Sequence, residues 1–82
     1  MKILAEVRTP GNGKLYEIIL DDKLTVRAVK EKVIEEIISF ENGCIEFGED
    51  TALFSASSLS RLPDGSNLRK AGFRSGQTLI LV

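Results

Sequence analysis

The sequence contains no histidine and only one cysteine, Cys44. Without histidine, neither a Ser-His nor a Cys-His catalytic pair can form, and a zinc site would lack its usual nitrogen ligand. A single cysteine also excludes an internal disulfide. The acidic pairs Asp21-Asp22 and Glu49-Asp50 lack further ligands at the spacing of a calcium loop. We therefore expect a protein that is not an enzyme and that binds no metal, cofactor or small-molecule substrate.

Long apolar runs are missing too. The longest, such as TLILV at the end, are far too short to cross a bilayer, and the first residues do not resemble a signal peptide. A formal net charge of -1 with a pI near 5.4 gives no general attraction to nucleic acid or to acidic membranes. These absences predict a cytoplasmic protein that recognises its partner locally, without nucleic-acid binding or membrane insertion.

What is present is typical of one small globular domain spanning residues 1–82. Hydrophobic residues make up 43% of the chain and charged residues 28%, proportions that permit a packed core. A chain of this length is too short for a second independent core.

Two stretches near the start alternate between apolar and polar residues, which is typical of half-buried strands. Residues 1–8 and 14–20 are therefore predicted strands. Their expected core-facing side chains are those of Met1, Ile3, Ala5, Val7, Tyr16, Ile18 and Leu20.

The segment between these strands, TPGNGKL, has the glycines and the Gly-Lys pair of a phosphate-binding loop. A Walker loop, however, needs a glycine where Arg8 stands and a Ser or Thr where Leu15 stands, and it must open a helix. A strand follows here instead. We interpret the segment as the tight turn of a hairpin.

A helix is predicted from Val26 to about Ser39, because apolar residues recur at spacings of three and four. Thr25 is suited to cap its first turn, and Gly43 can take a left-handed conformation after its end.

The second half contains shorter elements. Residues 44–47 and 77–82 are predicted strands, and residues 51–55 are predicted to form a weak strand at the edge of the sheet. A partner could add a strand to this edge, or the acidic residues beside it could prevent such pairing. Cys44 then belongs to a strand, which favours a buried, inert thiol over a reactive one. Pro63-Asp64-Gly65 predicts a turn. Three later side chains are expected to fill the core: Leu68, Ala71 and Phe73.

The resulting order, β-β-α-β-β-β, predicts an α+β fold in which one helix covers a mixed five-stranded sheet and the last strand lies parallel to the first. The segments KLYEIILDDKLTVRAVKEKV and LPDGSNLRKAGFRSGQTLILV resemble ubiquitin. The chain is thus similar to the ubiquitin-like β-grasp proteins. Ubiquitin's recognition patch includes an isoleucine on its third strand, and the matching position here resembles Glu46, which implies that ubiquitin receptors do not bind this protein.

Conjugated and sulfur-carrying members of this family end in a flexible Gly-Gly tail, whereas the present sequence ends at Val82 within the last predicted strand. Gly76-Gln77-Thr78-Leu79-Ile80-Leu81 resembles the G-x-x-L-x-L ending of the small bacterial YukD/EsaB type. That resemblance implies a non-catalytic, protein-binding accessory or regulatory component of a type VII (ESX-like) secretion system. The alternative is a ubiquitin-like modifier or sulfur carrier whose tail is absent here.

The candidate binding site is the sheet face turned away from the helix. If the strands adjoin in the order second, first, last, five aliphatic side chains gather there. They are Leu4, Leu15, Ile19, Ile80 and Val82. The alternative is that strand-favouring residues are merely scattered over an exposed sheet. A loose basic cluster offers a weaker RNA-binding alternative, although such charges usually form a solvated face; it comprises Arg61, Arg69, Lys70 and Arg74.

Overall fold

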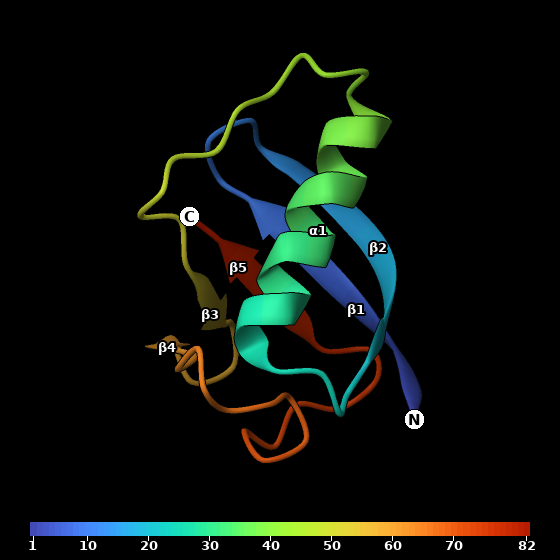
Figure 1. The fold of residues 1–82 in the computed structure, drawn as a ribbon, viewed down its shortest axis with the longest axis vertical. Coiled ribbons are helices and arrows are strands. Elements are labelled where there is room, and N and C mark those ends of the chain that lie inside the picture. Colours follow the sequence, from blue (N-terminus) through green and yellow to red (C-terminus); the bar gives the residue numbers. More distant parts are fainter.

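A computed structural model describes all 82 residues of the sequence, and it shows one helix packed across one face of a five-stranded sheet (Figure 1). The helix and strands are β1 (Lys2–Thr9), β2 (Lys14–Asp21), α1 (Val26–Phe40), β3 (Leu53–Ser55), β4 (Ser60–Arg61) and β5 (Thr78–Leu81). The strands lie in the order β2-β1-β5-β3-β4. β1 is antiparallel to β2 and parallel to β5. The predicted architecture, with the last strand beside the first, is confirmed.

The hairpin forms as its alternating pattern predicts, except that Met1, expected to face the core, precedes β1 and is 77% exposed. Tyr16, Ile18 and Leu20 of β2 are buried under α1. The turn between the strands is closed by bonds from the amides of Asn12 and Gly13 to the carbonyl oxygen of Thr9, at 3.2 and 2.9 Å. Gly13 has a φ of 69°, a conformation that glycine adopts without steric cost. TPGNGKL is therefore a turn and not a phosphate cradle.

The helix lies across the sheet through its stripe of aliphatic residues. Val26, Val29, Val33 and Ile37 are its buried residues. At its start the hydroxyl of Thr25 accepts a bond from the amide of Ala28 at 3.2 Å, which confirms the predicted cap. Beyond its end Gly43 has a φ of 76°, as expected for a left-handed residue after a helix. α1 is the one helix in the structure, and it is neither long enough nor apolar enough to cross a bilayer.

The core is one cluster between α1 and the inner face of the sheet. β5 contributes Leu79 and Leu81, as the alternation in the sequence predicts. The long segment before β5 contributes Leu68 and Phe73, but Ala71, expected in the core with them, is exposed. Ala71 belongs to a turn whose amides bond back to Asn67 and Arg69, so its side chain faces solvent.

The segment after the helix departs most from expectation. Residues 44–47 form no strand and run instead as a loop between α1 and β3, which arches over one end of the sheet in Figure 1. Ile45 and Phe47 pack against the core, which explains the alternating pattern without a strand partner. Cys44 is exposed, so the prediction of a buried thiol was wrong.

The weak strand expected at residues 51–55 exists as β3, but it is not at the edge. β3 pairs with β5 on one side and with the two-residue strand β4 on the other. β4 arises in the serine-rich stretch before Pro63, where the sequence pattern predicted no strand. The free edges of the sheet therefore belong to β2 and β4, and the pairing leaves no free edge for strand addition at residues 53–55.

Candidate protein-binding face

The face of the sheet opposite α1 is not covered by any helix or strand, and we call it the open face. Its side chains alternate along each strand with the buried residues of the core. Three of the predicted site residues are more than half exposed there: Leu15 at 54%, Ile19 at 58% and Val82 at 61%. Leu4 is 39% exposed, and Ile80 is half-buried. All five predicted residues thus reach the surface of the molecule.

The strand register divides these residues into two groups. Leu4 on β1 lies directly opposite Ile19 on β2, and this pair forms one apolar spot. Leu15 and Ile80 belong to another row, where they flank Arg8 of β1 from β2 and from β5. Val82 follows Ile80 by two residues and exchanges two backbone bonds with Ala52, at 2.9 and 3.0 Å. The predicted residues therefore share a face but do not form one contiguous patch.

A row of two acidic residues separates the two apolar groups. Glu6 of β1 and Glu17 of β2 are direct cross-strand partners. A carboxylate oxygen of Glu6 accepts a bond from the Thr78 hydroxyl at 3.2 Å, whereas the carboxylate of Glu17 has no hydrogen-bond partner in the structure. The open face thus carries an acidic centre between two apolar areas.

The larger apolar area includes a residue that the sequence did not reveal. Phe54 of β3 lies opposite Ile80 of β5 on one side and opposite Arg61 of β4 on the other. With Leu15 and Arg8, these residues form one row across all five strands. The sequence held no signal for this residue, because Leu53 and Phe54 are both apolar and only the pairing of β3 shows which of them faces outward.

This register also changes which residue occupies the centre of the third strand. Glu46 lies in the loop before β3, so its suggested match to a third-strand isoleucine was wrong. Phe54 occupies the outward position at the middle of β3 instead. The expectation that ubiquitin receptors do not bind this protein therefore loses its basis.

A second group of polar contacts lies at the hairpin turn and the end of α1. Glu41, which caps the helix, accepts bonds from the Lys14 ammonium at 2.9 Å and from the Tyr16 hydroxyl at 2.7 Å. Tyr16 also stacks on Phe40, with ring centroids 6.0 Å apart. The hydrogen bond from Lys14, followed by that from Tyr16, lowers the pKa of Glu41, and the bond to Glu41 raises the pKa of Lys14. These contacts hold the end of the helix on the hairpin.

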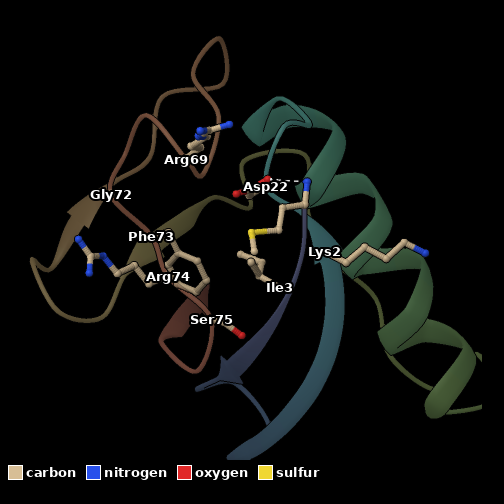
Figure 2. A pocket seen from close by; sticks show the side chains of 9 residues that line it. Lys2, Ile3, Asp22, Arg69, Gly72, Phe73, Arg74 and Ser75 are labelled. Atoms are coloured by element: carbon tan, nitrogen blue, oxygen red, sulfur yellow. Dashed lines mark ion pairs between the residues drawn. The ribbon is translucent and has the colours of Figure 1, made fainter.

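Three hollows mark the surface. The smallest, of about 360 Å³, lies between the hairpin turn and residues 45–48. A second, of about 420 Å³, extends around the edge strand β2 from Glu17 and Ile19 of the open face to α1, where the Lys32 ammonium donates a bond to the carbonyl oxygen of Ile19 at 3.3 Å. The third, of about 520 Å³, lies beside Asp22 and the loop that contains Arg69 and Arg74 (Figure 2). Its lining carries charges of both signs, and Figure 2 shows Arg69 and Arg74 on separate parts of that loop.

The remaining candidate groups stay apart. Arg61 lies on β4, outside the lining of the hollow that holds Arg69 and Arg74, so the basic residues do not gather in one place. No three Asp, Glu or Cys side chains come together as a metal site would require. The carboxyl group of Asp21 accepts a hydrogen bond within its own turn, from the amide of Lys23 at 2.9 Å, and this bond lowers its pKa.

Comparison with known proteins shows which solved structures share this fold. No protein-family model matches the chain, and no curated protein matches it in sequence. Among solved structures, the ubiquitin-like domain of Plasmodium falciparum Dsk2 is similar over 100% of this chain and 97% of its own, with a TM-score of 0.78 and 22% identity. The EccD5 ubiquitin-like domain of Mycobacterium xenopi is similar over 100% and 93%, with a TM-score of 0.81 and 11% identity.

A ubiquitin-like domain from Arabidopsis thaliana gives a TM-score of 0.73 at 22% identity, covering 99% of this chain and 76% of its own. The strand order, the single helix and these likenesses together show a ubiquitin-like β-grasp fold. At these identities the likeness concerns the fold alone.

Proposed function

We propose that this protein is a non-catalytic binding module that recognises another protein through its open face. The observation that carries the proposal is the uncovered row of Leu15, Arg8, Ile80 and Phe54, together with the exposed pair Leu4 and Ile19. Scattered apolar residues on a surface need no explanation, but apolar side chains that adjoin on neighbouring strands, as Ile80 adjoins Phe54 and Leu4 adjoins Ile19, are typical of binding surfaces.

The chemistry available to the chain favours binding over catalysis. With no histidine, its serines and its exposed Cys44 have no imidazole to act as general base. The three groups with displaced pKa values are Lys14, Asp21 and Glu41, and each displacement is explained by contacts that fix a turn or the end of α1. We infer that none of them serves a reaction.

The open face supplies enough apolar surface for a modest affinity. Fully burying one large aliphatic or aromatic side chain contributes roughly 1.5–3 kcal/mol. Three or four such side chains, some already half-buried, would contribute a gain similar in size to the association cost of about 4–15 kcal/mol, which favours a weak, reversible complex over a tight one. A module of this kind suits a regulatory component better than a permanent subunit.

The likeness to the EccD5 domain supports a place in type VII secretion, because the sequence independently resembles the YukD/EsaB type. We therefore propose a cytoplasmic accessory role in such a bacterial system. The likeness to the Dsk2 domain is consistent with a binding module in general and gives no separate partner.

A secretion assay tests this function. In the bacterium that encodes the protein, deletion of the gene should reduce export of type VII substrates, and the wild-type gene should restore it. A gene carrying Phe54→Asp and Ile80→Asp should fail to restore export, although circular dichroism shows the purified variant to be folded. Glu35→Lys, on the exposed side of α1, is the matched control and should restore export.

Two results would contradict the proposal. Normal export after deletion would remove the secretion role, and full restoration by the double variant would remove the open face. If the gene product is instead recovered covalently attached to other proteins, or carrying sulfur at its end, the modifier or sulfur-carrier alternative is correct.

A further inference from the structure

The acidic centre of the open face indicates which kind of partner would fit it. Glu6 and Glu17 lie directly opposite each other on neighbouring strands, with side chains on the same face. Like charges in this arrangement are destabilising. None of the ion pairs in the structure includes either residue. The protein thus maintains two adjacent carboxylates without a cation of its own.

The neighbouring basic residues form no ion pair with these two carboxylates. Arg8 lies in the next row, opposite Leu15 and Ile80, and Lys2 lies two residues before Leu4, opposite Asp21. Neither Arg8 nor Lys2 forms an ion pair with Glu6 or Glu17. A cation supplied by a bound partner would therefore meet two carboxylates that are already in place.

Apolar surface lies on both sides of this acidic pair along the strands. Leu4 and Ile19 form the row before it, and the row of Leu15, Ile80 and Phe54 follows it. Adjacent rows on one face are two residues apart along a strand, or about 6.6 Å. The face thus presents apolar, acidic and apolar zones at regular intervals of that size.

An α-helix matches this spacing and the chemistry of a sheet face. Side chains four positions apart on a helix lie on one side, separated by a rise of about 6 Å. A helix also satisfies its own backbone hydrogen bonds, whereas an extended peptide laid on the middle of a sheet face would bury unpaired backbone groups. A helix with a basic residue between aliphatic residues would therefore cover all three zones.

We propose that the open face binds an amphipathic helix of a partner protein whose apolar stripe is interrupted by a lysine or arginine, with that cation seated between Glu6 and Glu17. The inference rests on the proposed function, because it specifies the partner of the same face. The aliphatic residues provide the buried area, and the acidic pair selects helices that carry the central cation.

A pair of synthetic peptides tests the inference. Each is an alanine-rich helix of about 17 residues, with leucines three and four positions on either side of the centre. The centre is lysine in one peptide and glutamine in the other. Both are titrated into the isotope-labelled protein at low salt while its backbone amide signals are recorded by NMR. We expect the lysine peptide to bind at least about threefold more tightly, with the largest shifts at Leu4, Glu17 and Ile19.

Variants of the protein assign that difference to the acidic pair. In the double variant Glu6→Gln and Glu17→Gln, the two peptides should bind equally. The control, Glu35→Gln with Glu49→Gln, changes the total charge by the same amount at exposed positions off the open face and should keep the preference. Raising the salt concentration should weaken the preference in the wild type and leave the double variant unaffected.

The free protein gives a second measurement that needs no partner. Removing the repulsion should raise the melting temperature of the double variant by roughly 1–3 °C at low salt. The control variant should not show this gain. If the double variant melts no higher than the wild type, the two carboxylates do not repel each other and the inference fails.

The peptide results separate the inference from the function on which it rests. Equal binding of both peptides to the open face of the wild type would overturn the role of the acidic pair and leave a helix-binding face. Shifts confined to α1, with none at Leu4, Glu17 or Ile19, would overturn the inference and weaken the open-face proposal with it. If neither peptide shifts any signal at millimolar concentration, the inference is wrong, and the secretion assay decides the function alone.

Discussion

The two faces of β1 show how the same strand serves two purposes. Ile3, Ala5 and Val7 point toward α1 and are buried. The residues between them, Glu6 among them, point the other way and remain at least partly in solvent. The inner face carries no charged side chain on β1 and is mainly aliphatic, as close packing requires, whereas the open face mixes aliphatic, acidic and basic side chains in rows. The inner face holds the fold together, and the open face is free to carry recognition.

The sharpest test of this division uses two adjacent residues of β5. Leu79→Ala removes a fully buried side chain and should lower the free energy of unfolding by about 2–5 kcal/mol. Ile80→Ala, on the open face, should lower it by about 1 kcal/mol or less. Urea denaturation of both variants measures the difference. Equal losses would show that the open face is also a packing surface.

Removing the cap at the start of α1, the helix that covers the inner face, should have a smaller effect on stability. Thr25→Ala removes the hydroxyl that accepts from the amide of Ala28 and should cost about 1 kcal/mol of stability. Thr25→Ser retains that hydroxyl and serves as the control. If both variants lose the same stability, the effect comes from the Thr25 methyl group and not from the cap.

A substitution in a turn that belongs to neither face should increase stability. Leu59 is exposed and has a φ of 54°, a left-handed conformation that is unfavourable for leucine. Leu59→Gly relieves this strain but adds backbone entropy to the unfolded chain, so we expect a net gain of about 0.5 kcal/mol. Thermal unfolding measures it. A loss of stability would show that the Leu59 side chain makes contacts that the exposed position does not suggest.

The smallest effect concerns the other end of α1 and depends on pH. Because the pKa of Glu41 is lowered in the folded protein, its ionised form adds stability above the usual carboxyl range. That contribution is lost as the pH falls through the lowered pKa. The free energy of unfolding should therefore be larger for the wild type than for Glu41→Gln at neutral pH. This difference should vanish in acid. A constant difference across the pH range would contradict this account.

Local pattern sufficed to predict much of the fold. β1, β2 and β5 alternate strictly enough to define their buried residues, and the Val26–Phe40 helix carries its own cap and stripe. Residues 44–47 misled because Ile45 and Phe47 alternate with exposed neighbours in a loop, which has the period of a strand but no partner. β4 could not be predicted, since two polar residues become a strand only by pairing with Phe54 and Ser55.

The candidate site was predicted less completely, and for the same reason. The five aliphatic residues are on the predicted face because the alternation fixes which side they take. Their grouping depends on register, which the hydrophobic pattern alone did not give for β3. Register places Phe54 beside Ile80 and places Glu6 opposite Glu17. The acidic pair was visible in the sequence as two unrelated residues, and only strand pairing makes it one feature.

The position of β5 also affects how the chain reaches its native state. β5 lies between β1 and β3, so the middle of the sheet joins residues from opposite ends of the sequence, as in the pairing of Val7 with Leu79. A ribosome synthesising this chain must release residues 78–81 before that gap can close. Until then, the facing edges of β1 and β3 lack their partner and are open to pairing with other chains. We expect folding to be completed only after residues 78–81 have left the ribosome, in a late step limited by slow, long-range strand pairing.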